Sequence, residues 1–283
     1  MKKEYRDKLP KWVDEVDSNK NILILTDDID SLFSCAILND YFWGLNVEGF
    51  YNFKELYFTE PKKIKGMQPI WIDSDCSTGK VFGNHVTYVK NDNAINMNQF
   101  KSGGYTNKYA GSTVLTILSV YDYDLTQFSD EQLMVLLAID SSFLGAYSDY
   151  FYNTWEKWMN IMELDVFINL VDKYTIDDFN NIIKKYSLKE KIRIKNGKLK
   201  TDIKLKGIRK LFPLFDFDMN LGEKQFNKFM EFETFYGKMG FIKHDENKIF
   251  SSARTYKNQM SYSVKKKGVK NLWQKQKQVY STT

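Results

Sequence analysis

Residues 21–34 read NILILTDDIDSLFS and combine a strand, a carboxylate-rich turn and the start of a helix. The run Asn21–Thr26 is short and rich in Ile and Leu, which is typical of a strand that is buried on both faces. Three aspartates follow at 27–31, and apolar residues then recur at helical spacing until Gly44. The stretch therefore predicts the first strand–helix step of an α/β fold.

The same alternation continues through the first half of the chain. Further strands are predicted at Val47–Phe53, Pro69–Ile72 and His85–Val89, and helices over Tyr109–Val120 and Leu133–Ile139. Ser129 or Asp130 is expected to cap the second of these helices. Strands that alternate with helices over this length predict a mostly parallel sheet flanked by helices.

The pattern changes beyond residue 150. Three short helices are predicted at Trp155–Met162, Val166–Tyr174 and Phe179–Tyr186. Asn196-Gly197 between two alternating segments predicts a hairpin in the basic stretch Lys189–Lys210. The aromatic-rich stretch Phe212–Phe241 is predicted to be partly helical. We therefore expect three units, which are a metal-binding domain (1–150), a helical connector (151–190) and a smaller basic α+β domain that binds substrate (191–283).

The net charge of +5 hides an asymmetry between the two parts of the chain. Residues 1–180 hold 16 basic and 27 acidic side chains, whereas residues 181–283 hold 25 basic and 9 acidic ones. Acidic groups gather cations and a basic surface attracts phosphate, so the two parts are expected to do different work. The alternative for the basic part is a solvated, lysine-rich surface.

Composition excludes several classes of protein. With two cysteines and two histidines, the chain has neither a disulfide framework nor a four-cysteine zinc site, nor any site with three histidines. No apolar run reaches the ~18 residues that span a bilayer, so we expect a cytoplasmic protein with no membrane partner. The 37 lysines against 4 arginines are typical of AT-rich coding, as in some phages, which would make the location a host cytoplasm.

Two groups of carboxylates follow predicted strands. Asp28 and Asp30 come after the first strand, and Asp73 and Asp75 come after the third. In open α/β sheets, ligands bind beyond the carboxyl ends of the strands, and carboxylate oxygens suit Mg²⁺ and Mn²⁺. His85 offers a nitrogen ligand nearby. The alternative is an Asp-rich loop in which one Asp caps the following helix.

Taken in order, five short motifs resemble those of the DHH phosphoesterase superfamily, over about residues 20–145. They are Asp28-Ile29-Asp30-Ser31-Leu32-Phe33-Ser34, Trp71-Ile72-Asp73, Gly83-Asn84-His85, Asn96-Met97 and Leu136-Leu137-Ala138-Ile139-Asp140. The superfamily includes single-strand exonucleases of RecJ type, oligoribonucleases, cyclic-dinucleotide phosphodiesterases and family II pyrophosphatases. Here Ser31 stands at a position usually held by Gly, and His85 is the one histidine kept from the Asp-His-His motif.

The resemblance implies a site that uses two Mn²⁺ or Mg²⁺ ions, or one if a ligand is missing, to hold a phosphate and activate water. The implied metal ligands are Asp28, Asp30, Asp73, His85 and Asp140. Asp73 and His85 would also be catalytic. Asn84 or Asp75 could replace a missing ligand, and Asn84 would contact substrate.

Basic residues of the second half are expected to bind the substrate. Arg254 lies in the stretch Ser251–Thr255, which suits bidentate phosphate binding. Lys265, Lys266 and Lys267, with Tyr262 and Trp273 nearby, could follow a nucleic-acid backbone while the rings stack bases. The alternatives are a surface salt bridge and a frayed basic tail.

The expected function is that of a metal-dependent phosphodiesterase that hydrolyses single-stranded nucleic acid or short oligonucleotides. A second hypothesis is a catalytically degenerate DHH protein that binds nucleic acid or a cyclic or other nucleotide without cleaving it. A third is an unrelated α/β scaffold with Asp-rich loops. The sequence makes no prediction of the oligomeric state.

Overall fold

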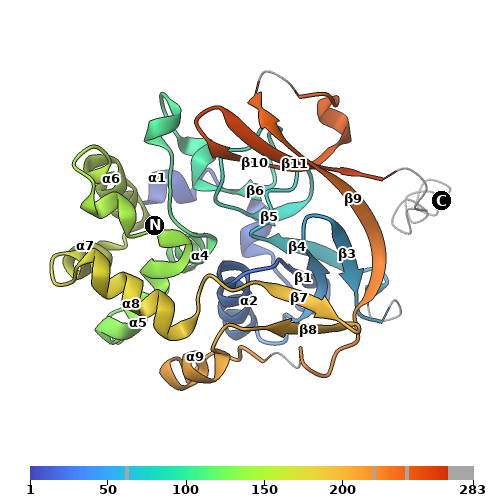
Figure 1. The fold of residues 1–283 in the computed structure, drawn as a ribbon, viewed down its shortest axis with the longest axis horizontal. Helices are drawn as coiled ribbons and strands as arrows, with labels where there is room; N and C mark the ends of the chain where they lie inside the picture. The colour runs from blue at the N-terminus through green and yellow to red at the C-terminus, as the bar shows by residue number, and fades with distance from the viewer. Residues whose placement is uncertain (61–63, 219–220, 240–241, 267–283) are drawn as a thin grey trace.

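A computed structural model describes residues 1–60, 64–218, 221–239 and 242–266 (Figure 1). Its centre is one large, curled sheet. The strands of that sheet are β1 (Asn21–Leu25), β2 (Val47–Tyr51), β3 (Glu55–Phe58), β4 (Gln68–Ile72), β5 (Lys80–Phe82), β6 (Ala94–Ile95), β9 (Asn227–Lys238), β10 (Ile249–Tyr256) and β11 (Gln259–Lys265). A separate hairpin consists of β7 (Ile192–Lys195) and β8 (Lys198–Thr201).

The sheet is mixed. Its strand order is β10-β11-β9-β3-β2-β1-β4-β5-β6. The pairs from β2 to β6 are parallel, whereas those from β10 to β2 are antiparallel. The expected α/β class is therefore confirmed, but the parallel arrangement covers only half of the pairings in the described residues.

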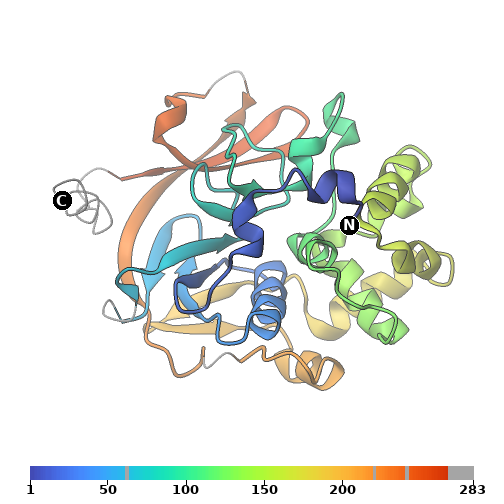
Figure 2. The same cartoon turned by 180° about the vertical axis from the view of Figure 1, so that it is seen from behind.

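The described residues form several helices. They are α1 (Lys3–Arg6), α2 (Ile29–Tyr41), α4 (Thr113–Val120), α5 (Asp130–Ala138), α6 (Tyr152–Met162), α7 (Asp165–Val171), α8 (Ile176–Tyr186) and α9 (Leu205–Leu211). Helix α2 packs on one face of the parallel strands β1 and β4. Leu23 and Leu25 of β1 pack with α2, α4 and α5 in the larger core. Figure 2 shows α1 beside α6, where the Lys2 peptide N–H donates to the Ile161 carbonyl. None of the helices in these described ranges is long and apolar enough to cross a membrane.

The other face of the parallel strands is covered by the sheet itself. The long strand β9 bends around one side of the molecule and leads through β11 to β10 (Figure 1). Strand β10 bridges to Cys76 in the loop after β4 and bonds to Val86 in the loop after β5. Ile24 and Trp71 of the parallel strands thereby share a core with Phe232 of β9. The Ser77 peptide N–H donates to the Phe250 carbonyl at 2.8 Å, which ties β10 to the loop after β4. The C-terminal strands thus form a wall over the carboxyl ends of the parallel strands.

Several predicted elements are confirmed. The Asn196-Gly197 hairpin is β7–β8, and its turn residues have positive φ values of 53° and 74°, as a two-residue hairpin turn requires. Ser129 caps α5 in a capping box with Gln132. The three helices expected after residue 150 are α6, α7 and α8.

Two predictions are wrong. His85–Val89 is a loop, and the strands nearest to it are β5 and β6. The backbone hydrogen bonds of this loop go to β10 and not to a neighbouring parallel strand. The Arg254 peptide N–H donates to the Val86 carbonyl, and Ser252 Oγ accepts from the Tyr88 peptide N–H. The stretch expected to be partly helical between 212 and 241 instead contains β9, which pairs with β3 and β11. Long-range pairing decides its structure, and the sequence prediction missed its partner β3.

Candidate metal centre

The parallel strands β1, β4 and β5 end at one edge of the sheet, and each continues into a polar turn. Asp28 follows β1, Asp73 follows β4 and Asn84 follows β5. From β1 the chain passes first to β2 on one side and later to β4 on the other, so the strand order reverses between β1 and β4. Ligands of open α/β sheets bind at such a reversal. The topology therefore brings the acidic turns to the place where this class of fold binds ligands.

Asp30 lies in the first turn of α2 and is completely buried against the N-terminus of α4. Its Oδ2 accepts a hydrogen bond from the peptide N–H of Thr113 at 2.7 Å, and its Oδ1 accepts one from Val114 at 2.8 Å. A helix leaves these peptide groups unpaired at its N-terminus, where its dipole also favours negative charge. Asp30 therefore links α2 to α4 whether or not it also binds a cation.

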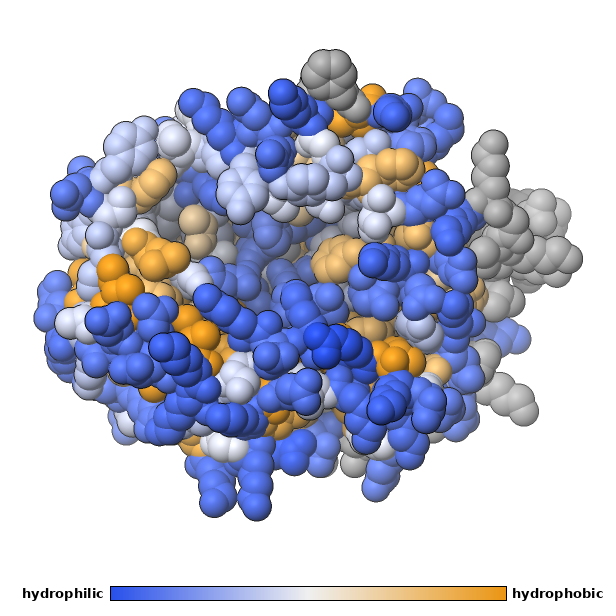
Figure 3. All heavy atoms as spheres, viewed as in Figure 1, coloured by the Kyte–Doolittle hydropathy of each residue, from blue (hydrophilic) through white to orange (hydrophobic). Residues whose placement is uncertain are grey.

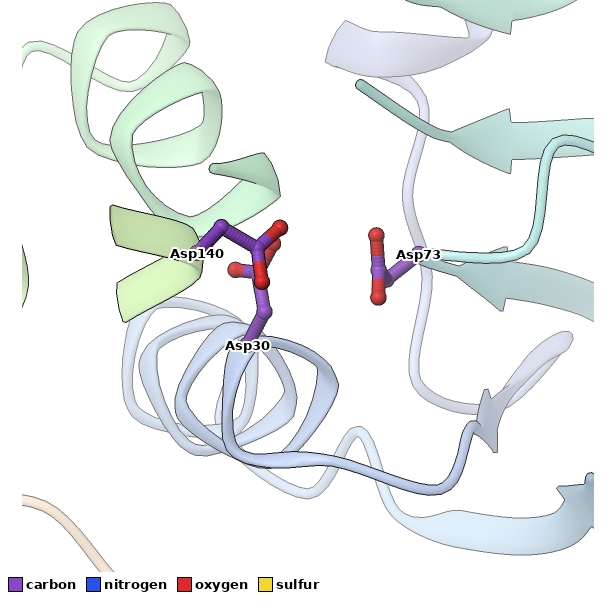
Figure 4. A group of neighbouring side chains, drawn as sticks. All are labelled: Asp30, Asp73 and Asp140. Carbon is purple, nitrogen blue, oxygen red and sulfur yellow. The ribbon is translucent and has the colours of Figure 1, made fainter. Parts of the chain in front are cut away.

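Asp73 and Asp140 complete a group of three carboxylates with Asp30 (Figure 4). One oxygen from each residue lies within 4.8 Å of those of the other two. Asp73 accepts a hydrogen bond from Thr113 Oγ1 at 3.0 Å, whereas Asp140 lies in the turn after α5. Both have a left-handed backbone, with φ values of 53° and 54°, which Asp adopts more readily than most residues do. Three segments that are distant in the sequence thus converge on one point.

Asn84 connects two of these carboxylates. Its Nδ2 donates to Asp140 at 2.8 Å and to Asp30 at 3.4 Å. The residue is 5% exposed, and its Oδ1 has no hydrogen-bond partner within the described part of the chain. An unpaired buried amide oxygen is costly, so a cation or a donor group of a ligand would stabilise it.

The carboxylates of the centre hold their protons more tightly than isolated carboxyl groups do. Burial raises the pKa of Asp30 and of Asp73 well above the usual value, and neighbouring carboxylates raise both further. Desolvation and the charge of Asp28 raise the pKa of Asp140. A divalent cation would offset this repulsion and favour the ionised forms.

His85 forms a pair with Asp75 beside the three carboxylates. Its Nδ1 lies 2.7 Å from Asp75 Oδ2, which leaves Nε2 as the ring nitrogen available to a ligand. Burial alone would lower the pKa of His85, but the hydrogen bond to Asp75 and the charges of Asp75, Asp73 and Asp140 raise it to about 9. Asp75 is in turn held by Asn96 at 3.0 Å. The pair sits at the edge of the centre, outside the group of three carboxylates.

Asp28 faces Lys191, a residue that the sequence analysis did not single out. Asp28 caps α2 by accepting from the Ser31 peptide N–H, and its other oxygen lies 3.1 Å from Lys191 Nζ. Lys191 also pairs with Asp27 at 3.0 Å, and the Ile192 peptide N–H donates to the Asp27 carbonyl. Although burial opposes it, the two aspartates raise the pKa of Lys191. A lone lysine in a lysine-rich stretch carries no sequence signal for this contact, because the pairing depends on how β7 packs beside β1.

The centre opens into a cavity of about 750 Å³, and Figure 3 shows a hollow in this face of the molecule. Asp28, Asp73, Asp75, Asn84, His85 and Asp140 line one side. The wall formed by β10 and β11 adds hydroxyl groups, among them those of Ser251, Ser252 and Ser263. Trp155 and Trp158 of α6 line a third side. The cavity thus combines carboxylates, hydroxyl groups and aromatic rings.

The structure does not bring the expected substrate-binding cations into this cavity. Arg254 instead lies over the ring of Tyr105, 4.4 Å from its centroid, and donates to the Lys257 carbonyl. Lys265 lies over the Phe250 ring, and Lys266 pairs with Glu231. The described cavity lining includes Tyr105 but none of these three cations. Lys267 and Trp273 lie outside the described residues.

The oxygen-rich donor set fits a hard divalent cation. Asp30, Asp73 and Asp140 each offer a carboxylate oxygen, and Asn84, whose Oδ1 is unpartnered, is bonded to two of them through Nδ2. Mg²⁺ and Mn²⁺ prefer such oxygen ligands. Of the five expected metal ligands, Asp30, Asp73 and Asp140 therefore come together, whereas Asp28 and His85 line the cavity beside them.

Comparisons of the chain with protein-family models, with curated proteins and with solved structures find no match.

Proposed function

We propose that this chain is a metal-dependent phosphodiesterase of the DHH type that hydrolyses single-stranded nucleic acid or short oligonucleotides. The observation that carries the proposal is the convergence of Asp30, Asp73 and Asp140 on one point, where Asn84 bonds to two of them. These residues come from the ordered motifs on which the family resemblance rests. They also lie at the reversal of strand order, where α/β folds bind ligands.

Mg²⁺ or Mn²⁺ held by these oxygens, as one ion or two, would neutralise phosphate charge and lower the pKa of a water molecule. The side chains of the protein bind and orient the ester. His85 presents Nε2 to the cavity, because Nδ1 is bonded to Asp75, and there it serves as a nitrogen ligand or donates to a phosphate oxygen. Trp155 and Trp158, which are both buried, form an apolar part of the lining and exclude water from it.

One observation favours a second candidate, a protein that binds a nucleotide or nucleic acid without cleaving it. Both oxygens of Asp30 already accept peptide N–H groups of α4, which leaves fewer lone pairs for a metal. Asn84 also stands where the resemblance expects the first histidine of the motif. Either feature would weaken one of two metal positions.

Nucleotide release from end-labelled single-stranded DNA, with Mn²⁺ or with chelator, tests the proposal. Asp73→Asn is the informative variant, and we expect it to lower the rate on the order of 100-fold, since even residues that only support metal ligands matter at the 10–100-fold level. Asp122→Asn is the matched control, because Asp122 has a similar φ of 48° but is exposed and outside the cavity lining. A cleavage rate that is unchanged by the chelator or by the Asp73 substitution would contradict the proposal. Tight binding without cleavage would support the second candidate.

A further inference from the structure

The outer face of the β7–β8 hairpin carries four cations in register. Arg193 lies directly opposite Lys200, and Lys195 lies directly opposite Lys198. Side chains opposite each other in an antiparallel pair have Cβ atoms about 5 Å apart, so like charges in these positions repel. We call these four residues the cationic ribbon. Its charges destabilise the free hairpin, and a bound polyanion would relieve that repulsion.

The packing of the hairpin keeps these four cations on its solvent-facing side. Its other face is apolar, and Ile192 and Leu199 are buried in the main core. Side chains alternate between the two faces of a strand, so burial of this apolar face fixes the cations outward. The ribbon is therefore a fixed surface feature.

Acidic neighbours do little to neutralise the ribbon. Arg193 has a distant partner in Asp202, at 3.9 Å. The ion pairs of the described residues include none for Lys195, Lys198 or Lys200, and all three side chains are exposed.

The ribbon is continuous with the proposed catalytic cavity. Lys191 precedes β7 and lies two residues before Arg193. Side chains two residues apart in an extended segment point to the same side, so Lys191 and Arg193 do so here. Lys191 lines the cavity and pairs with Asp27 and Asp28 of the turn after β1. Figures 1 and 3 place the hairpin and its hydrophilic surface beside the hollow. The cationic ribbon on β7 thus begins next to the cavity mouth, where Lys191 is neutralised by Asp27 and Asp28.

We propose that the cationic ribbon binds the phosphate backbone of single-stranded nucleic acid and guides one end of the strand to the cavity. Alternate residues of a strand are about 6.6 Å apart, so the ribbon presents regularly spaced cations to a charged phosphate backbone. A lipid surface fits less well, because membrane-binding faces combine cations with exposed apolar side chains, and this face has none among its described residues. The guidance of the strand rests on the proposed function, whereas the backbone contact does not.

The test removes the charge of the ribbon without touching the cavity. The variant carries Arg193→Gln, Lys195→Gln, Lys198→Gln and Lys200→Gln, and the control carries Lys2→Gln, Lys3→Gln, Lys8→Gln and Lys11→Gln, four exposed cations of the N-terminal segment seen in Figure 2. Fluorescence anisotropy measures binding of a labelled 20-nucleotide oligo(dT) in chelator, over a range of KCl concentrations. Since the ribbon substitutions remove repulsion, thermal unfolding of that variant is expected at an equal or higher temperature.

We expect the ribbon variant to bind at least about tenfold more weakly at low salt. The slope of log affinity against log salt should fall by about 0.7 for each phosphate that the variant no longer neutralises. The control variant should match the wild type. Unchanged affinity and slope in the ribbon variant would overturn the proposal, as would wild-type binding to phosphatidylserine vesicles but not to the oligonucleotide. Hydrolysis of a small phosphodiester in Mn²⁺ by the wild type and by the ribbon variant measures the activity of the carboxylate centre separately. If neither protein hydrolyses it, the result counts against the proposed function and not against the ribbon.

Discussion

Asn84 places an uncharged hydrogen-bond donor between two carboxylates of the centre. Its Nδ2 donates to Asp30 and Asp140, and its Oδ1 is unpartnered. Asn84→Asp would replace that donor by a further acceptor among carboxylates. In chelator, we expect this variant to lose about 1–3 kcal/mol of unfolding free energy. With Mn²⁺ the loss should shrink, because an added carboxylate is an added ligand.

Urea unfolding with and without Mn²⁺ measures both effects. Asn93→Asp is the control, since Asn93 is exposed in the turn before β6 and should change little in either condition. If Mn²⁺ stabilises Asn84→Asp no more than it stabilises the wild type, Asn84 does not adjoin a cation site.

Among the elements, the contact between α2 and α4 depends on Asp30. Two peptide N–H groups donate to its two oxygens, whereas Asn offers one acceptor and would place an NH₂ group against the second peptide N–H. We expect Asp30→Asn to cost about 0.5–2 kcal/mol in the metal-free protein, the range measured when a helix cap is removed. Asp73→Asn should cost less, because it keeps an acceptor for the Thr113 hydroxyl and removes a repelling charge.

Chemical denaturation of the two variants in chelator compares these costs. Equal losses would mean that Asp30 acts as an ordinary member of the carboxylate group, without a special part in joining the helices.

The elements also show how far the sequence could be interpreted. Local signals sufficed for β1, β4, the Ser129 cap and the Asn196-Gly197 turn, because each depends on neighbouring residues. They failed for β9, whose structure depends on pairing with β11 and with β3, which lies about 170 residues earlier in the chain. The convergence of Asp30, Asp73 and Asp140 followed from the strand-end rule and the family resemblance. The role of Lys191 could not be predicted, since it depends on where the hairpin packs.

At the scale of the whole molecule, the curled sheet encloses the centre. Tyr51 of β2 bonds through its hydroxyl to Ser251 of β10 and Ser263 of β11, at 3.0 and 2.7 Å. Both serines line the cavity, so the wall opposite the carboxylates is fixed to the parallel strands by a buried polar contact. Within this enclosure Asp30 and Asp73 are buried, and the lower local dielectric strengthens the repulsion between their carboxylates.

We expect this enclosure to couple the stability of the protein to pH and to divalent ions. The pKa values of Asp30, Asp73 and Asp140 are raised above the ordinary value of 3.8. Their contribution to stability is therefore present at low pH and is lost as pH rises through the folded-state values. His85 acts in the same direction, since its pKa of about 9 means that its contribution is lost as pH rises through 9. In chelator, this group of side chains should make the protein progressively less stable from pH 5.5 to pH 8.5.

Mg²⁺ should reverse this trend, because its ligands must be deprotonated and the ion supplies the charge that the protons otherwise provide. A concentration 100 times the dissociation constant adds about 2.7 kcal/mol to the free energy of unfolding. We expect the rise in Tm on adding Mg²⁺ to be larger at pH 8.5 than at pH 5.5. An Asp73→Asn/Asp140→Asn double variant should lose most of the Mg²⁺ effect at both pH values, since two of the three clustered carboxylates are gone. A Mg²⁺ effect of equal size at both pH values, or one that survives in the double variant, would show that the ion binds elsewhere on the protein.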